Sequence, residues 1–358
     1  MHELILNNIH SFMPEFLSDN DPTAVERKSD HIELALQSQI AAPTLDSRFY
    51  YEPLLAAHPS AAGGGSIAPI PFLGKTLRVP MWVSSMTGGT QKARIINQNL
   101  ARACAEFGMG MGLGSCRSLL YSDEYLPDFD VRELMGDQMP LFANLGVAQL
   151  EELIEKDELH LISDMVKKLR ADGLIIHVNP MQEWLQPEGD RFKKAPIDTI
   201  KTVLEHVAYP IIVKEVGQGM GKASLRALLQ LPLAAIDFAA NGGTNFAKLE
   251  LLRSDEQKQL IFNELAHIGH TAYEMTDLTN ELLLELGERV QCRQIIVSGG
   301  IKTFLDGFYC IKKLKTPAIY GQASGFLQHA QGDYPTLRRY ISAQVQGLEL
   351  AYNYLTVK

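Results

Sequence analysis

Residues 174–216 read LIIHVNPMQEWLQPEGDRFKKAPIDTIKTVLEHVAYPIIVKEV, and this stretch carries the repeating unit of the fold. Two short runs of branched apolar residues, 174–178 and 211–213, frame a polar loop and a longer helical pattern. Strands that are apolar on both faces and alternate with helices are typical of a parallel sheet that is buried between helices. The stretch therefore predicts one strand–helix–strand unit, with polar residues where its strands end.

The same pattern repeats from about residue 78 to the end of the chain. Apolar runs end in Gly, Ser, Asn or Thr, and helical patterns follow them; the eight runs cover residues 79–85, 108–114, 140–144, 174–179, 211–216, 234–238, 295–300 and 318–321. Eight such units over about 270 residues are what a closed (β/α)8 TIM barrel requires, whereas an open doubly wound sheet needs fewer strands. The barrel is the predicted fold, and the long interval before the seventh run predicts extra helix around residues 254–288.

The first 70 residues differ from the repeating part, so we predict an N-terminal extension over residues 1–70 and a barrel over residues 71–358. The extension ends near the small-residue run 61–66, which is typical of a flexible connection. Its charged cluster Arg27-Lys28-Ser29-Asp30-His31 has two interpretations. It is either a solvated helix start or a segment that closes over an anionic substrate.

Composition and charge exclude several classes of protein. The net charge of −9 argues against a general nucleic-acid or anionic-membrane surface. The four cysteines form no CxxC pair, and no apolar run approaches the roughly 20 residues of a membrane helix. The N-terminus has no basic segment followed by an apolar signal core. We expect a cytoplasmic protein in a reducing compartment, without nucleic-acid or membrane partners.

Polar residues cluster at the carboxyl ends of the predicted strands, which is where TIM barrels carry their functional groups. One polar residue after a strand is ordinary turn chemistry, but polar groups at nearly every strand end predict a ligand-binding mouth. These residues are Ser85, Thr87, Ser115, Arg117, Asn144, His177, Asn179, Lys214, Asn241, Thr244 and Ser298.

Two glycine-rich strand ends predict a phosphate site. Ser298-Gly299-Gly300-Ile301-Lys302 follows the seventh apolar run, and Gly321-Gln322-Ala323-Ser324 follows the eighth. Glycine lets the backbone approach an anion, and the loops after these two strands are the recurrent phosphate site of the fold. The alternative is a pair of tight turns between strand and helix.

Lys214 and Glu183 are the two charged residues with the clearest functional alternatives. Lys214 lies inside an apolar run, where a lysine is costly to bury without a partner. It either pairs with its neighbour Glu215, forms a Schiff base, or places a cation beside an electron-rich cofactor. Glu183 is either a solvated carboxylate or the single carboxylate of a magnesium site that also uses substrate phosphates.

The chain also contains an ordered set of motifs, about one for each strand end. They are Arg27-Lys28-x-Asp30-His31, Met86-Thr87-Gly88-Gly89, Gly114-Ser115-x-Arg117, His177-x-Asn179-Pro180-x-Gln182-Glu183, Gln186-Pro187-Glu188-Gly189-Asp190, Val213-Lys214-Glu215-Val216-Gly217, Gly242-Gly243-Thr244-Asn245 and Ser298-Gly299-Gly300-Ile301. Together they resemble the type 2 isopentenyl diphosphate isomerases from about residue 26 to about residue 330.

The resemblance implies a flavin mononucleotide (FMN) barrel that needs reduced FMN and a divalent cation, usually magnesium. Residues implied to bind the flavin are Ser85, Met86, Thr87, Ser115, Asn144, Lys214 and Thr244, and those implied to hold its phosphate end are Gly299, Gly300, Lys302, Ala323 and Ser324. Residues implied to surround the diphosphate substrate are Arg27, Lys28, Ser115, Arg117, His177, Asn179 and Gln182. Glu183 is implied to coordinate the metal that bridges the diphosphate.

The resemblance also implies a reaction and an assembly. Isopentenyl diphosphate gains a proton at its terminal alkene carbon and loses one from C2, which gives dimethylallyl diphosphate without net oxidation. The flavin N5 is the implied proton carrier, and Gln182 is the implied protein residue that assists it. Residues 1–70 are implied to contribute to substrate binding, NADPH is the usual reductant, and a homotetramer or larger homo-oligomer is expected.

Two other functions compete with this interpretation. An FMN-dependent 2-hydroxy acid oxidase or dehydrogenase needs a histidine base and an arginine clamp near the seventh strand, and residues 298–302 contain neither. A non-catalytic flavin-binding barrel would bind flavin without turnover. The chain also departs from the commonest family pattern at Cys116, where Gln is frequent, and at Lys302, where Arg is frequent. Lysine contacts phosphate without the bidentate fork of arginine.

Overall fold

The computed structural model describes residues 23–59, 67–85 and 91–358, and they divide into two compact units at the Phe49–Tyr50 bond. Met86 and Thr87, which the resemblance assigns to the flavin, lie outside these residues. The first unit contains α1 (Ala24–Leu34), which carries Arg27 and Lys28, and the short helix η1 (Ala42–Thr44). The second unit contains the whole barrel, so the predicted role of residues 1–70 in substrate binding stays a prediction.

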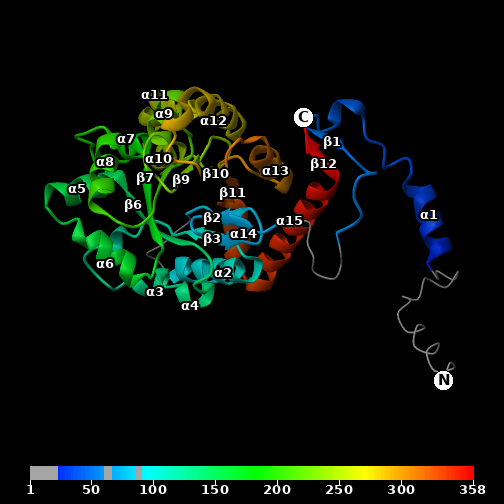
Figure 1. Cartoon of the computed structure of the whole chain (residues 1–358), viewed down its shortest axis with the longest axis horizontal. Coiled ribbons are helices and arrows are strands. Elements are labelled where there is room, and N and C mark those ends of the chain that lie inside the picture. The colour runs from blue at the N-terminus through cyan, green and yellow to red at the C-terminus, as the bar shows by residue number, and fades with distance from the viewer. Residues whose placement is uncertain (1–22, 60–66, 86–90) are drawn as a thin grey trace, which may run out of the picture. The chain divides into compact units, whose positions relative to one another are not determined.

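The second unit is built on a closed barrel of eight parallel strands (Figure 1). The strands are β4 (Met81–Val83), β5 (Gly110–Gly112), β6 (Leu141–Gly146), β7 (Gly173–Val178), β8 (Ile211–Glu215), β9 (Ala235–Asp237), β10 (Ile295–Ser298) and β11 (Ala318–Gln322). Each strand pairs with its neighbours in sequence, and β11 closes the barrel onto β4. The predicted TIM barrel is confirmed, with all eight strands inside or within two residues of the expected runs.

Helices follow the strands and cover the outside of the barrel (Figure 1). They are α2 (Gln91–Phe107), α3 (Leu126–Phe129), α4 (Arg132–Met135), α5 (Val147–Glu155), α6 (His160–Lys168), α8 (Pro196–His206), α9 (Lys222–Leu229), α12 (Ala272–Leu286), α13 (Phe304–Lys313), α14 (Ser324–Ala330) and α15 (Tyr334–Tyr354). Local sequence fixes several of their starts. Thr303 and Asp306 form a capping box at α13, and Asp333 caps α15 just before Pro335.

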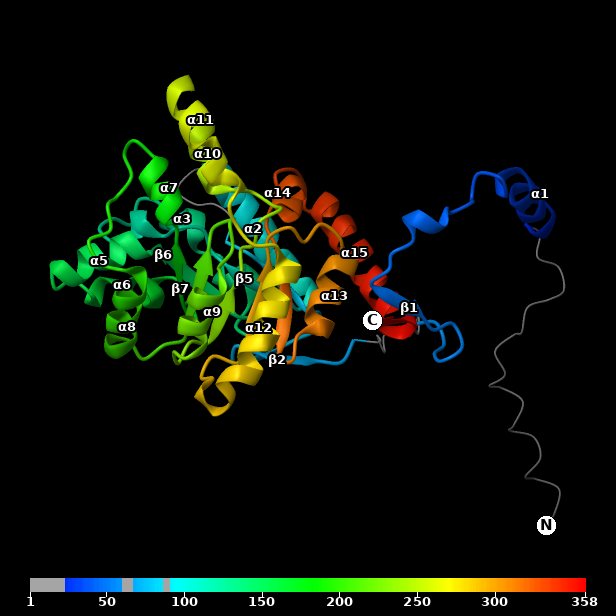
Figure 2. The ribbon, with the colours of Figure 1, turned by 90° about the horizontal axis from the view of Figure 1, so that it is seen from above.

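Extra helices interrupt the repeat on the side of the barrel where the strands end. They are η2 (Arg117–Leu119), α7 (Pro180–Leu185), α10 (Phe246–Arg253), α11 (Glu256–Phe262) and η3 (Asn263–His267), whereas η4 (Gly287–Arg289) follows α12 and precedes β10. A small apolar cluster of Leu185, Ala247, Leu251 and Ala266 packs α7 against α10. In Figure 2 the α10–α11 insertion projects away from the barrel. The extra helix that the sequence predicts around residues 254–288 is thus present as α11 and α12.

A β-hairpin of β2 (Ile70–Phe72) and β3 (Lys75–Leu77) lies against the segments where the barrel strands begin. Its two-residue turn, Leu73-Gly74, has positive φ at both positions, as hairpins of this length require. The Leu73 N–H donates to Gln294 just before β10, while Lys75 forms a 2.6 Å ion pair with Asp172 just before β7. The hairpin therefore spans the amino end of the barrel.

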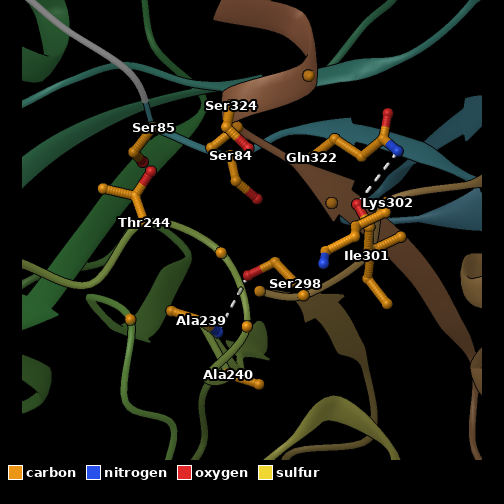
Figure 3. Close-up of a pocket in the computed structure, with 18 of the residues that line it drawn as sticks. Ser84, Ser85, Ala239, Ala240, Thr244, Ser298, Ile301, Lys302, Gln322 and Ser324 are labelled. Atoms are coloured by element: carbon orange, nitrogen blue, oxygen red, sulfur yellow. Dashed lines mark hydrogen bonds between the residues drawn. The ribbon is translucent and has the colours of Figure 1, made fainter. Parts of the chain in front are cut away.

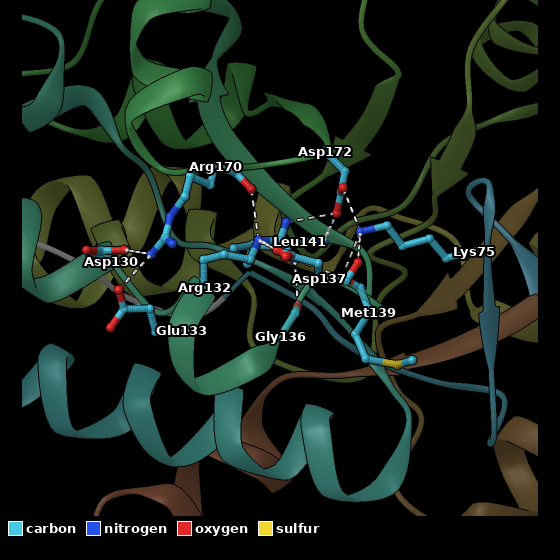
Figure 4. A network of polar contacts seen from close by, with 10 residues as sticks. All are labelled: Lys75, Asp130, Arg132, Glu133, Gly136, Asp137, Met139, Leu141, Arg170 and Asp172. Carbon is cyan, nitrogen blue, oxygen red and sulfur yellow. Dashed lines mark hydrogen bonds and ion pairs between the residues drawn. The ribbon is translucent and has the colours of Figure 1, made fainter.

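A buried ion network ties this end together (Figure 4). The Arg132 guanidinium is almost fully buried, donates to the Asp172 carboxylate at 2.9 Å, and donates to three backbone carbonyls, those of Gly136, Met139 and Arg170. Burial alone raises the pKa of Asp172, but bonds from Lys75, the Leu141 N–H and Arg132 outweigh it and hold that pKa below its usual value. Figure 4 shows these groups converging where β6 and β7 begin.

A short two-stranded sheet joins the beginning and the end of the second unit. A short strand, β12 (Leu355–Val357), ends the chain and pairs with β1 (Phe49–Tyr51) where this unit begins.

The side chains of all four cysteines are buried, and none forms a disulfide within the described residues. Among the helices of that same part of the chain, none has the length and apolar character needed to cross a membrane.

Candidate functional site

A cavity of about 380 Å³ opens at the carboxyl ends of the strands, between β4 and the β8–β11 side of the barrel (Figure 3). It collects most of the residues that the sequence predicts for flavin binding. Those lining it are Ser85, Lys214, Thr244, Gly299, Gly300, Lys302, Ala323 and Ser324. Its size falls within the range of ordinary ligand pockets, which is about 300–1,000 Å³.

Two predicted flavin residues lie outside the lining of this cavity. Ser115 is exposed after β5, and Asn144 is buried in β6. The Asn144 side chain donates to the Leu113 carbonyl at 3.0 Å, and its backbone carbonyl accepts the Cys116 N–H at 2.7 Å. Asn144 therefore joins β6 to the segment that carries Ser115.

The glycine-rich end of the cavity needs its glycines for geometric reasons. Gly299 and Gly300 have φ values of +84° and +70°, which residues with a side chain rarely adopt. A Cβ at Gly299 would also collide with the backbone of Ala240, and one at Gly300 would lie 2.9 Å from the Asn241 carbonyl oxygen. The loops after β9 and β10 thus pack backbone against backbone beside the cavity.

Lys302 stands at the same end, and the backbone N–H groups just before α13 are already bonded. Asp306 accepts the N–H groups of Lys302 at 3.1 Å and Thr303 at 2.8 Å. A phosphate in this corner would therefore meet the Lys302 side chain and the glycine backbone rather than the N–H groups of Lys302 and Thr303.

The floor of the cavity is polar, with Lys214 at its centre. Only 8% of Lys214 is exposed, and its Nζ donates to the backbone carbonyl of Glu215 at 2.7 Å. The Glu215 carboxylate instead accepts three backbone N–H groups, those of Gly217, Gln218 and Gly219. Burial raises the pKa of Glu215, although these bonds and the Lys214 charge oppose the rise. The ammonium group thus reaches the cavity without a side-chain ion pair to Glu215.

Asp237 lies beneath this floor, and sequence reasoning did not single it out. It is fully buried in β9, accepts a hydrogen bond from the Ser298 hydroxyl, and lies 3.5 Å from the Ser84 hydroxyl. Burial raises the pKa of Asp237, while the Lys214 charge and these hydroxyls oppose the rise. The signal that could have found it is a carboxylate in the middle of the apolar run 234–238.

A second polar cluster follows β5 and β7 and joins three of the predicted substrate residues, Arg117, Asn179 and Gln182, to Glu183. Asn179 donates to Gln182 at 3.0 Å and to Glu183 at 2.9 Å. Glu183 also accepts the Asp190 N–H at 2.8 Å, and the Asp190 carboxylate pairs with Arg117 at 3.1 Å. One connected network therefore links these residues.

Three members of this network were not predicted as site residues. Asp190 also accepts a hydrogen bond from Gln149 at 2.9 Å, and the nearly buried Glu250 lies 3.4 Å from the Gln182 amide nitrogen. Asp190 belongs to the motif of residues 186–190, so the sequence carried a signal for it. Gln149 and Glu250 lie in α5 and α10, where an isolated polar residue gives no distinctive signal.

His177 is held neutral near the centre of the barrel mouth. Its Nδ1 lies 2.8 Å from the Asn144 side-chain oxygen. Burial and the nearby Lys214 charge lower the pKa of His177 from 6.5 to about 4. A neutral imidazole can donate or accept a hydrogen bond, but it brings no positive charge to an anionic ligand at neutral pH.

This shift predicts a pH dependence of folding stability. Because the unfolded chain takes up the proton near pH 6.5 and the folded chain only near pH 4, stability falls as the pH drops through that window. We expect His177 to account for a loss of about 2–3 kcal/mol between pH 7 and pH 4.5. Urea unfolding at both pH values should show that His177→Gln loses less stability on acidification by about that amount. Equal losses in the variant and the wild type would contradict the prediction.

Two buried oxygens near the mouth lack a protein partner. Ser85 Oγ and Asn179 Oδ1 have no hydrogen-bond partner among the described residues. Buried polar atoms are nearly always satisfied, so both oxygens are candidates for contact with a ligand. Ser85 lines the cavity and, with the glycine backbone beside Lys302, fits a bound molecule that has a polar ring edge and a phosphate, whereas Asn179 belongs to the second polar cluster.

Metal binding by this site would use few protein ligands. Within residues 23–59, 67–85 and 91–358, no group of three or more His, Cys, Asp or Glu side chains could hold a metal ion. Glu183 lies at the mouth with both carboxylate oxygens hydrogen-bonded by Asn179 and the Asp190 N–H. A single carboxylate fits magnesium, which keeps several waters and takes other ligands from substrate phosphates.

Similar solved structures share the barrel. A mandelate oxidase variant with an FMN adduct superposes with a TM-score of 0.53 at 13% identity, covering 87% of this chain and 88% of that chain. A flavocytochrome b2 variant with sulfite bound gives a TM-score of 0.56 at 13% identity, covering 85% and 70% of the two chains. At this identity the likeness concerns the fold alone.

Sequence relatives are much more similar, although no family model matches the chain. An isopentenyl-diphosphate delta-isomerase of Rickettsia felis is 34% identical over 335 residues, covering 92% of each chain. The proteins of the same name from Rickettsia africae and Rickettsia prowazekii are 34% identical over 331 residues and 33% identical over 307 residues. The alignment with the Rickettsia africae protein covers 92% of that protein and 91% of this chain. The alignment with the Rickettsia prowazekii protein covers 86% of each. By this identity over nearly its whole length, the chain belongs to the isopentenyl-diphosphate delta-isomerase family.

Proposed function

We propose that this protein interconverts isopentenyl diphosphate and dimethylallyl diphosphate with reduced FMN and magnesium, as a type 2 isomerase. The observation that carries the proposal is the closed barrel of an isomerase-family chain whose cavity is lined by eight of the residues predicted for FMN. A phosphate corner, a buried cation and a separate polar network for a diphosphate lie at the same end of the barrel.

The cavity offers distinct contacts to the two ends of FMN. Lys302 and the backbone of Gly299 and Gly300 would hold the phosphate, while Lys214, Ser85 and Thr244 would hold the polar edge of the ring. When bound and reduced, FMN supplies an electron-rich surface and an exchangeable proton at N5. The Lys214 cation favours the anionic form of that ring because opposite charges attract strongly in a partly buried site.

The second polar cluster is suited to the diphosphate. Arg117 supplies a fork of donors for phosphate oxygens, and binding would exchange its partner Asp190 for the substrate. Asn179 and the neutral His177 can each donate a hydrogen bond. Glu183 would hold a magnesium ion, which would offset the negative charge of the diphosphate.

The chain's own residues also exclude water and limit proton transfer. Val216, Ala239, Ala240, Phe246 and Ile301 give the cavity apolar walls, which protect a cation-like species from water. The Gln182 amide is oriented by Asn179 on its oxygen and by Glu250 near its nitrogen. An amide is a poor acid, so Gln182 serves mainly to orient the substrate and to assist proton transfer. NADPH as the reductant and a homotetramer or larger assembly stay predictions.

The 2-hydroxy acid oxidase alternative is not favoured. The loop after β10 contains Lys302 but neither the histidine base nor the arginine clamp that such chemistry needs. The mandelate oxidase and flavocytochrome b2 structures share the barrel with this chain at only 13% sequence identity.

The direct test is an anaerobic NMR assay of the purified protein with FMN, a reductant and magnesium in deuterated water. We expect isopentenyl diphosphate to be converted to dimethylallyl diphosphate with deuterium incorporation, and no conversion while FMN stays oxidised. Reduced FMN that binds but leaves the substrate unchanged would refute the proposal, and 2-hydroxy acids would be tested next.

Arg27 gives a separate prediction about the N-terminal helix. If Arg27 contacts the diphosphate, Arg27→Ala should raise KM for isopentenyl diphosphate by about 10–100-fold and leave FMN occupancy unchanged. Glu33→Gln, an exposed change on the same helix α1, is the matched control and should leave both unchanged. FMN loss without a change in KM would show that α1 serves the cofactor instead.

A further inference from the structure

Two opposite charges on neighbouring strands lie at and beneath the floor of the cavity. Lys214 of β8 is directly paired with Asp237 of β9 in the barrel register, and His177 of β7 is paired with Lys214 on its other side. Lys214 lines the cavity, and Asp237 contacts Ser84 and Ser298, which line it too. All these side chains therefore face the interior of the barrel rather than the outer helices.

The Asp237 carboxylate is held from several directions. The Ser298 hydroxyl donates to one of its oxygens, and the Ser84 hydroxyl lies 3.5 Å from the other. Ser298 Oγ also accepts the Ala239 N–H at 3.0 Å, which fixes this hydroxyl to the end of β9. A carboxylate with no exposed surface is costly, so a buried cation and fixed donors are what make it tolerable.

The charges that face Lys214 come from three strands. Asp237 lies on β9, Glu215 follows it on its own strand, and His177 faces it from β7. His177 is neutral at neutral pH, and three backbone N–H groups already balance the Glu215 carboxylate. Asp237 is therefore the group that most directly offsets the Lys214 charge.

We propose that Asp237 is a positioning residue of the flavin site, which holds Lys214 and the Ser84 and Ser298 hydroxyls in place and sets the balance between reduced and oxidised FMN. The inference rests on the proposed function, because it needs FMN in this cavity. Asp237 lies below the lining, so it acts through Lys214. Its negative charge draws the Lys214 ammonium toward β9, which weakens the positive potential that an anionic reduced ring would meet.

Asp237→Asn is expected to raise the midpoint potential of bound FMN. In Asp237→Asn the Lys214 cation loses its buried countercharge, so reduced FMN should gain about tenfold in affinity relative to oxidised FMN. For a two-electron couple this ratio corresponds to a midpoint potential about 30 mV higher. The potential of bound FMN is measured anaerobically against a redox dye, and oxidised FMN affinity by fluorescence titration.

A double-mutant cycle tests whether Asp237 acts through Lys214. In the Lys214→Met background, Asp237→Asn should leave the midpoint potential within about 10 mV, since the cation that it balances is gone. The same 30 mV shift in that background would overturn the inference, and so would an unchanged potential in the single variant. If Asp237→Asn does not fold by circular dichroism, Asp237→Ser is neutral and smaller and carries the same expectation.

Asp172→Asn is the matched control, because Asp172 is also a carboxylate near cations, but it is half-buried and lies at the amino end of the barrel. It should lower thermal stability and leave the flavin potential unchanged. The wild-type titration separates the two hypotheses. A wild-type protein that binds no FMN refutes the proposed function. If the wild type binds FMN but Asp237→Asn has the same midpoint potential, only this inference is refuted.

Discussion

Glu183→Gln is expected to lower kcat/KM for isopentenyl diphosphate by about 10²–10³-fold and to remove most of the stimulation by magnesium. The amide keeps the shape of the side chain but loses the charge that would hold the metal against the diphosphate, and a bound cation contributes several kcal/mol of charge stabilisation. Glu183 does not line the cavity predicted for FMN, so flavin occupancy should be unchanged.

The measurement is a magnesium titration of the isomerase rate at fixed FMN, with FMN content read from its absorbance. Glu205→Gln, an exposed change on α8, is the control and should follow the wild-type curve. An unaltered magnesium dependence in Glu183→Gln would remove Glu183 from the metal site. Loss of FMN would place this carboxylate in the flavin site instead.

Arg132→Met is expected to lower the free energy of unfolding by about 3–5 kcal/mol, the largest stability effect that we predict. The methionine replaces most of the volume but leaves Asp172 with one cation fewer, and it leaves three backbone carbonyls without their donor. Removing one partner of a buried ion pair costs more than removing a surface pair because the remaining charge stays partly desolvated.

Urea unfolding followed by circular dichroism measures this effect. Arg170→Met is the matched control, since its guanidinium is about half exposed and pairs with Asp130 at 3.3 Å, while its backbone carbonyl still serves Arg132. We expect that variant to lie within about 1 kcal/mol of the wild type. If the two variants were destabilised equally, the buried network would not be the source of the effect.

The barrel could be predicted because each of its strands leaves a local trace in the sequence. A run such as Ile295–Ser298 is short, branched, buried on both faces and followed by two glycines. The capped starts of α13 and α15 are equally local. Elements held by distant partners were harder to predict. The β2–β3 hairpin is tied to the barrel by Leu73 and Lys75, whose partners lie 60 or more residues away.

The candidate site divides in the same way. Residues at strand ends, such as Ser85, Lys214 and Thr244, were predictable because a barrel brings all its strand ends to one face. Asp237 was missed because a carboxylate within an apolar run gives no sign of which neighbours it will meet. Gln149 and Glu250 were missed because they reach the site from helices, and sequence does not reveal which helical face turns inward.

The hairpin lies at the amino end of the barrel, opposite the carboxyl ends of the strands where the cavity opens. Phe72 and Leu77 of the hairpin are buried, so we expect a proton released inside the barrel to exchange with bulk water by way of the mouth. The extent of isotope exchange with water then reports how long the product stays bound before it is released. Multiple deuterium atoms in a single product molecule would show that the double bond moves back and forth several times before that molecule is released.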